Sequence, residues 1–438
     1  MRRLPLVLAT VLVCGGLAAA GGLTDPPRSA TAAPAAQAAP AHPAAPPPGG
    51  ALAAAIGADQ RHLRARPDDA AVWARLGGEY VEQARLTADA SYYPKADEAL
   101  HRSLTLAPTG NTDALTGLGA LANARHLFAE AADHARQALD GAPLHWQAWA
   151  VLTDARTQLG DDTGATEAAQ HLLDLHPGTA SFTRAAYDLE QHGRPEDAAD
   201  ALRRALDGAY DPGDKAFCLH QLAELDRTAG RTDAALDGYR RALAADPTYT
   251  AALAGQARAE AALGRTDDAL AHYAQAAAAV PLPQYLLELG ELHESLGHPG
   301  QAAEQYRLLR AEADLAAAGG VVDDLTLGQF EADHGDPATA VRLLRAEWDR
   351  RHHVLVADAL AWALHRTGAD REALGYADLA LAHGWHNALF RYHRGEIERA
   401  LGRTDQARAD LAGALATDPR FDPLQAPLAR SDLAALTP

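Results

Sequence analysis

Cysteine is nearly absent from this chain, which has only Cys14 and Cys218 among its 438 residues. Cys14 lies in the apolar stretch at the N-terminus, so removal of that stretch would leave one cysteine and no intramolecular disulfide. Cys218 lies between Phe217 and Leu219 in a helical pattern. A free cysteine in such surroundings usually packs as a small hydrophobic residue. We therefore expect a buried thiol with no reactive role.

Basic residues are fewer than acidic residues in this chain. The chain has 39 Lys and Arg against 58 Asp and Glu, a formal net charge of −19. Nucleic-acid binding requires clustered positive charge, and the sequence offers only isolated pairs such as Arg203–Arg204. The composition therefore argues against a nucleic-acid partner. Abundant Ala and Arg with very little Lys is typical of a GC-rich bacterial genome.

Catalytic motifs are missing as well. The sequence has no P-loop, GxSxG, HExxH, CxxC or glycine-rich dinucleotide turn. His293 and Glu294 lack the second histidine that a zinc-protease helix needs, and paired carboxylates such as Asp161–Asp162 fall where helices are expected to begin. We therefore expect no enzymatic activity and no cofactor.

A long apolar run occurs only at the N-terminus, where Arg2 and Arg3 precede Leu4–Leu23. The small residues Ala18–Ala20 follow the pattern of a cleavage site, so residues 1–23 are predicted to be a signal peptide. The run is also about as long as a membrane span, so an uncleaved anchor is the alternative. Residues 24–50, rich in Pro and Ala, are predicted to be an extended linker. We expect an exported protein, extracellular or associated with the cell envelope, with no other membrane segment.

What the sequence does have is a repeated spacing. Eight times a glycine is followed five residues later by an alanine, and successive glycines are 33, 37, 34, 33, 38, 33 and 34 residues apart. The pairs are Gly160/Ala165, Gly193/Ala198, Gly230/Ala235, Gly264/Ala269, Gly297/Ala302, Gly335/Ala340, Gly368/Ala373 and Gly402/Ala407. A period near 34 predicts a solenoid of stacked units rather than a domain with one central core.

The spacing has a local physical explanation. Glycine ends a helix because it adopts the left-handed conformation without a Cβ penalty. In the segment after Gly264 we expect Thr266 to cap the next helix, with Asp267 and Asp268 in its first turn, where the helix dipole favours negative charge. Each glycine is thus predicted to separate two helices, and each alanine to begin the buried face of the second.

These patterns resemble the tetratricopeptide repeat. Its small and apolar positions are matched by Trp73, Leu76, Gly77, Tyr80, Ala96, Leu100 and Pro108 in a first unit that carries an insertion, and further units begin near Thr112, Trp146, Ala180, Ala216, Thr250, Pro283, Val321, Val354 and Ala388. The resemblance implies an all-α, right-handed superhelical solenoid of about ten helix-turn-helix repeats over residues 51–420, with a C-terminal cap in residues 421–438. The longer glycine intervals are predicted to mark bends in the superhelix.

The resemblance also implies a function: a scaffold that binds a protein or peptide in the concave groove, which the first helix of each repeat lines. The last two repeats carry the aromatic, arginine and carboxylate mixture that is typical of interaction hot spots. The predicted partner-binding residues are Asp358, Trp362, His365 and Arg366 in one repeat and Tyr392, Glu396 and Arg399 in the next. The competing interpretation is that Trp362 or Tyr392 packs as core between repeats.

A second hypothesis comes from the histidines, of which there are 20. His352 and His353 lie in the link before one repeat, and His383 and His386 lie in the link before the next. If equivalent links lie side by side, these imidazoles converge on one edge, where they would bind a metal ion or a small ligand. The ordinary interpretation is that they are polar loop residues, because their spacing matches no recognised ligand motif.

Overall fold

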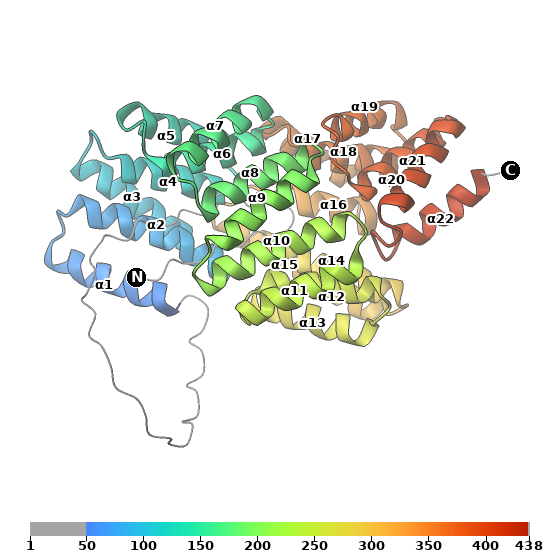
Figure 1. Cartoon of the computed structure of the whole chain (residues 1–438), viewed down its shortest axis with the longest axis horizontal. Helices are drawn as coiled ribbons and strands as arrows, with labels where there is room; N and C mark the ends of the chain where they lie inside the picture. The colour runs from blue at the N-terminus through green and yellow to red at the C-terminus, as the bar shows by residue number, and fades with distance from the viewer. Residues whose placement is uncertain (1–49, 437–438) are drawn as a thin grey trace, which may run out of the picture.

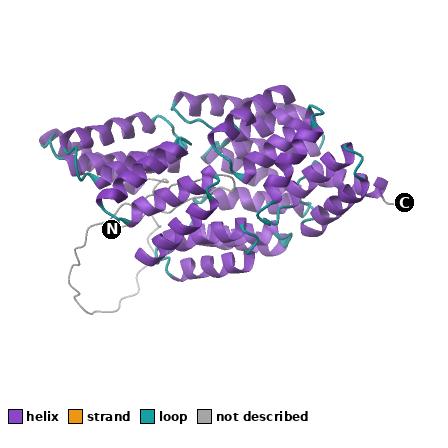
Figure 2. Cartoon of the chain, turned by 90° about the horizontal axis from the view of Figure 1, so that it is seen from above, coloured by secondary structure: helices purple, strands orange, loops and turns teal. Residues whose placement is uncertain are grey.

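The computed structural model describes residues 50–436, and every regular element in that range is a helix (Figures 1 and 2). The helices are α1 (Gly50–Ala65), α2 (Ala70–Thr87), α3 (Tyr92–Leu106), α4 (Thr112–Ala124), α5 (Phe128–Gly141), α6 (Trp146–Leu159), α7 (Asp162–Leu175), α8 (Thr179–Gln191), α9 (Pro195–Asp207), α10 (Pro212–Thr228), α11 (Thr232–Ala245), α12 (Thr250–Ala262), α13 (Thr266–Ala279), α14 (Pro283–Ser295), α15 (Pro299–Ala318), α16 (Leu325–His334), α17 (Pro337–Arg350), α18 (Val354–Arg366), α19 (Asp370–Leu381), α20 (Ala388–Ala400), α21 (Thr404–Thr417) and α22 (Gln425–Leu436). The prediction of an all-α solenoid is confirmed. The predicted signal peptide and linker lie outside the described residues, except Gly50, with which α1 begins.

The helices pack in consecutive pairs, α2 with α3 through α20 with α21. Below, the first helix of a pair is called the A helix and the second the B helix. The predicted glycines separate them: Gly264 has φ +75°, and its N–H and that of Arg265 donate back to Ala261 and Glu260 at 3.0 and 2.8 Å. Because Arg265 closes α12 and also flanks α13, Thr266 is the first residue inside α13 and not its cap. The prediction for Thr266 is wrong by one residue.

Small residues let the two helices of a pair, and neighbouring pairs, approach closely. The expected face of α11 is fully buried at Ala235, Tyr239 and Ala242. Gly255 on α12 lies directly over the ring of Tyr239, where an added Cβ would come within 2.4 Å of it. Close packing of this kind excludes larger residues, which explains why alanine and glycine recur at fixed offsets.

The solenoid winds until its later part lies against its earlier part. The link before α18 meets the end of α6, where the N–H of His352 donates to the carbonyl of Leu159 at 3.3 Å, and the link before α20 meets α8. Three turns between A and B helices, at Gly160, Gly193 and Gly230, touch two later links and the end of α21. A Cβ added to these glycines would come within 2.6, 2.6 and 2.4 Å of the carbonyl oxygens of His352, Gly384 and Thr417. The structure is therefore a closed coil rather than an open arc.

Two segments outside the regular repeat contribute to this closure. The long link after α15 reaches α3 and α4, because Gly319 packs on Ala90 and the N–H of Val322 donates to the carbonyl of Arg125 at 3.0 Å. At the C-terminus, α22 packs on α21 in the region predicted to form a cap. Within residues 50–436, none of the helices combines the length and apolar character needed to cross a membrane.

Candidate functional site

The coil encloses a cavity of about 460 Å³, within the range of ligand sites in proteins. Seven successive A helices each contribute the residue six positions before the turn that ends the helix. These residues are Asp154, Tyr187, Glu224, Arg258, Glu291, Gln329 and Trp362. The fixed offset follows from the repeat, because equivalent positions on stacked helices face the same way. The wall of the cavity is thus a row of side chains of mixed type, acidic, basic, aromatic and amide.

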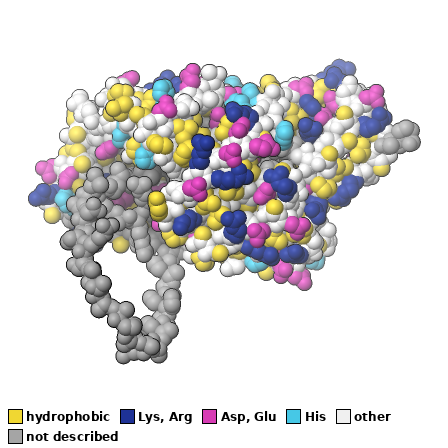
Figure 3. All heavy atoms as spheres, in the orientation of Figure 1, with side chains coloured by type: hydrophobic (Ala, Val, Ile, Leu, Met, Phe, Trp, Pro, Cys, Tyr) yellow, Lys and Arg dark blue, Asp and Glu magenta, His cyan; other side chains and the backbone are white. Residues whose placement is uncertain are grey.

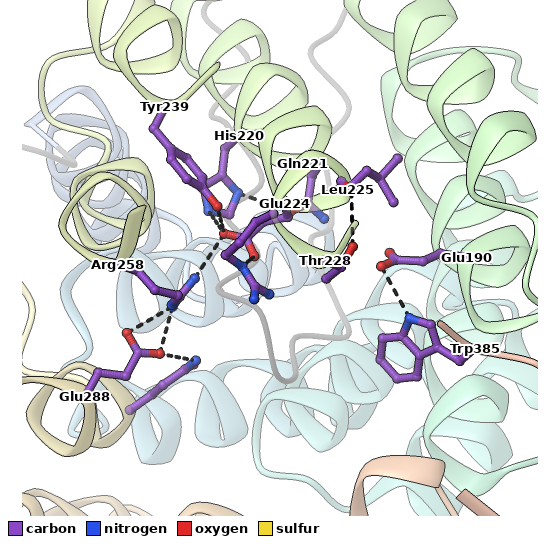
Figure 4. Close-up of polar contacts among 12 residues, drawn as sticks. Glu190, His220, Gln221, Glu224, Leu225, Thr228, Tyr239, Arg258, Glu288 and Trp385 are labelled. Atoms are coloured by element: carbon purple, nitrogen blue, oxygen red, sulfur yellow. Dashed lines mark hydrogen bonds and ion pairs between the residues drawn. The ribbon is translucent and has the colours of Figure 1, made fainter. Parts of the chain in front are cut away.

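The middle of the wall is a charged network on α10, α12 and α14 (Figure 4). Arg258 donates to Glu224 at 3.1 Å and to both oxygens of Glu288 at 2.7 and 3.0 Å. Tyr239 and Arg227 also donate to Glu224, at 2.5 and 2.8 Å. Burial alone would raise the pKa of Glu224, but the two arginines outweigh it and hold this pKa well below its usual range. This part of the wall is a fixed charge array at neutral pH.

Glu190 on α8 differs from that array, because its carboxylate accepts a long hydrogen bond from an indole and not from an arginine. The indole Nε1 of Trp385, in the link before α20, donates to it at 3.4 Å (Figure 4). Burial raises the pKa of Glu190 to about 7, and the charge of Glu224 adds to the effect. An ionised Glu190 is therefore costly where the early and late parts of the coil meet.

Replacing Glu190 by glutamine is expected to stabilise the protein at pH 8 by about 1–3 kcal/mol. The folded state holds a proton on Glu190 that the unfolded chain releases above about pH 4.5, so this contribution falls as pH rises through 4.5–7. Glutamine keeps the acceptor for Trp385 and removes the charge. The comparison is the denaturation midpoint of E190Q and the parent at pH 5 and pH 8. The prediction would be contradicted if E190Q changed the midpoint equally at both pH values, or by no more than the exposed control E167Q does.

The far end of the cavity is formed by α16, α18 and α20. The ring of His393 stacks on Trp362 with centroids 4.3 Å apart, and its Nδ1 lies 2.9 Å from Asp358. The indole of Trp362 donates to Asp333 at 2.8 Å. Burial opposes protonation of His393, yet Asp358 raises the pKa of this imidazole above its usual value. Aromatic and charged groups thus form one ordered surface.

The predicted partner-binding residues fall into three groups. Asp358 and Trp362 line the cavity. Tyr392 and Glu396 are buried, Tyr392 against Phe421 of the C-terminal segment and Glu396 in an ion pair with Arg399 at 2.5 Å. His365, Arg366 and Arg399 lie outside the lining, and His365 pairs with Asp370 at 2.6 Å. Trp362 therefore both packs between helices and faces the cavity, so the two interpretations are not exclusive.

The four histidines of the metal hypothesis are engaged separately. His353 is buried and accepts from the N–H of Leu355, His352 packs on Trp348, and His383 lies 3.1 Å from Asp162. Within residues 50–436, His386 included, no three His, Cys, Asp or Glu side chains are grouped so that they could hold a metal ion. The links meet earlier turns of the coil instead of one another, and the metal alternative gains no support.

Sequence reasoning missed the middle of the cavity, including Glu190, Arg258 and Glu288. For Arg258 the signal was present, because this residue lies six positions before Gly264, whereas Glu190 and Glu288 lie three and nine positions before their glycines and are not marked by that offset. A constant offset from the glycines, rather than residue type in the last repeats, marks the row of side chains along the cavity. Cys218 is as expected: it is buried, and burial raises its thiol pKa to about 12.

No protein-family profile matches the sequence. The cellulose synthase 1 operon protein C of Komagataeibacter xylinus is 25% identical over 363 residues, which are 82% of this chain and 24% of that protein. The chain therefore spans about a quarter of the length of this curated relative.

Solved structures with similar helices include a tetratricopeptide repeat protein from Parabacteroides merdae and the type IV pilus biogenesis factor PilW. The first is 17% identical with a TM-score of 0.35, covering 59% of this chain and 99% of its own. PilW is 21% identical with a TM-score of 0.38, covering 46% and 92%. The fold follows from the chain itself, because its helices pair where the repeat pattern predicts them: it is an all-α solenoid of helix pairs that resemble tetratricopeptide repeats.

Proposed function

We propose that this protein is a non-enzymatic scaffold of the cell envelope or exterior that binds a protein or peptide segment inside its closed coil. The observation that carries the proposal is the cavity wall, where seven successive A helices each present one side chain at the same offset, and these side chains are aromatic, acidic, basic and amide in type. A wall of mixed aromatic, acidic and basic residues is suited to an extended segment with several side chains.

The N-terminal pattern supports an exported location, since Arg2 and Arg3 precede an apolar run and small residues. The name of the curated relative, a protein of a cellulose synthase operon, is a second reason to seek the partner among envelope proteins. On the face shown in Figure 3, acidic and basic side chains are interspersed, so the selectivity of that face is expected to be lower than that of the cavity.

A photo-crosslinking amino acid at Gln329, which lines the cavity on α16, is expected to capture the partner from envelope extract of the native organism. The same amino acid at Tyr210, which is 89% exposed on the link after α9, is the matched control. We expect at least a tenfold higher yield of one discrete adduct at position 329. Equal yields at both positions, or no adduct at 329 with a correctly folded protein, would contradict binding in the cavity.

A further inference from the structure

Part of the cavity wall is not a repeat helix at all. Residues 417–430, the end of α21 through the start of α22, are here called the closing segment. Its members Asp418, Arg420, Phe421, Asp422, Pro423, Gln425, Pro427 and Arg430 line the cavity together with the A helices. A stretch of the chain itself therefore lies on the surface that the proposed function assigns to a partner.

The closing segment is held by specific contacts between its start and Gln425. At its start, Thr417 packs on Gly230, and Arg420 donates to the hydroxyl of Thr232 on α11 at 3.2 Å. In its middle, the ring of Phe421 lies against Tyr392 with centroids 5.5 Å apart. Further on, the amide of Gln425 donates to Asp333 at 3.3 Å. The segment thus bridges helices from the middle and the end of the coil.

Asp333 shows that the segment and the aromatic wall share one acceptor group. One of its oxygens accepts from Trp362 at 2.8 Å and the other from Gln425 at 3.3 Å. Gln425 also faces His393, the imidazole stacked on Trp362. A polar side chain from a partner would have to take the place of Gln425 to reach these groups.

The acidic side chain of Asp422, in the closing segment, lies among other acidic side chains. Asp422 caps α22 by accepting from the N–H groups of Leu424 and Gln425 at 2.7 and 2.6 Å. Asp422 also lies near two acidic side chains of the cavity lining, Glu291 on α14 and Asp333 on α16. Two imidazoles lie among these groups: His393 on α20, and His334 on α16, whose Nε2 is 3.1 Å from Glu291. Burial raises the pKa of Asp422, as does Asp333. Like charges at close range cost free energy, so the contact is weaker than its hydrogen bonds alone suggest.

We propose that the closing segment is an intramolecular occupant of the partner site, and that a partner segment displaces it with an aromatic residue against Tyr392 and a cationic residue in place of Asp422. This inference rests on the proposed function and names the chemistry of the partner. The aromatic residue reproduces the contact of Phe421. In place of the like charge of Asp422, the cation meets the carboxylate of Asp333, which already accepts from Trp362 and Gln425.

The test uses the full chain and a synthetic peptide with the sequence of residues 417–430. In the parent protein the segment occupies its own site, so the added peptide should bind weakly. In F421A/Q425A the tethered segment loses its ring contact and its bond to Asp333. We expect at least tenfold faster hydrogen exchange in residues 418–425 and at least tenfold tighter binding of the peptide. L428A, at a side chain of α22 that is 53% exposed, should behave as the parent.

Charge is tested separately with D422N, which keeps the helix cap and removes the repulsion. We expect slower exchange of the segment in D422N than in the parent at pH 8. A peptide carrying Asp422→Lys should bind F421A/Q425A at least tenfold more tightly than the natural peptide. Unchanged exchange in F421A/Q425A, or no peptide binding to it once the segment is released, would overturn the occlusion; equal affinity of the two peptides would overturn the cationic partner.

These outcomes are independent of the crosslinking experiment. Peptide displacement without any crosslinked partner at Gln329 would leave the occlusion standing and count against the proposed function. A crosslinked partner whose binding is the same in the parent and in F421A/Q425A would do the reverse.

Discussion

Replacing Arg351 by methionine is expected to lower the free energy of unfolding by about 3–5 kcal/mol, the range for removing one partner of a buried ion pair. Arg351, in the link before α18, is 1% exposed. Its guanidinium donates to Glu347 on α17 and to Gln158 on α6, and it lies 5.2 Å from the ring of Phe128. Methionine fills much of the volume but leaves the buried carboxylate with less compensation.

The remaining partners of Glu347 limit the loss without abolishing it. Arg350 pairs with this carboxylate, and the N–H of Asp324 donates to it at 3.1 Å. Chemical denaturation at pH 7 measures the effect, with R345M as the control because Arg345 is a half-exposed member of a surface ion pair with Glu372. Surface pairs contribute about 0–1 kcal/mol. Equal losses in R351M and R345M would show that the buried cluster does not hold the coil closed.

Two glycines with the same local sequence are expected to respond very differently to alanine. Gly230 and Gly264 both begin the letters GRTD and have φ of +70° and +75°. At Gly264 an added Cβ meets nothing within 4 Å, whereas at Gly230 it lies 2.4 Å from the carbonyl oxygen of Thr417. G264A should cost about 1–2 kcal/mol for the left-handed backbone alone, and G230A about 1–3 kcal/mol more.

The difference between these variants reports the closure of the coil. G230A is also expected to enlarge the radius of gyration in small-angle scattering and to speed hydrogen exchange in residues 417–420, because the turn and the link must separate. G264A should change neither quantity. Equal destabilisation by the two substitutions, with unchanged scattering, would mean that the contact between turn and link carries no energy.

The fold could be predicted from the sequence because the repeat pattern depends on interactions between residues that are close in sequence. A glycine that permits φ near +70°, an acidic first turn and an alanine face recur at offsets of a few residues, and each acts within one helix pair. The one-residue error at Thr266 has a local cause too. The turn is so short that Arg265 serves both helices, which the preference of threonine for caps did not reveal.

The closed coil could not be predicted in this way. The bond between Arg351 and Gln158 joins residues 193 positions apart, and that between Trp385 and Glu190 joins residues 195 apart. Such contacts depend on the small rotation added by every repeat, and no motif marks their residues. Residue type led to Trp362 and Asp358, which line the cavity, and their role in binding stays a prediction. The burial of Tyr392 against Phe421 could not be predicted, because it depends on where the C-terminal segment returns to the coil.

The separation between the turns and the links that cover them also sets an order of events. At synthesis rates of roughly 5–20 residues per second, the 193 residues between Gln158 and Arg351 take about 10–40 seconds to make. During that interval the later links that pack on the first turns have not yet been made, although each early helix pair already packs on its neighbours. The nascent chain is therefore an open arc that closes only when its last repeats emerge, and any segment that must enter the coil has its widest entrance before synthesis ends.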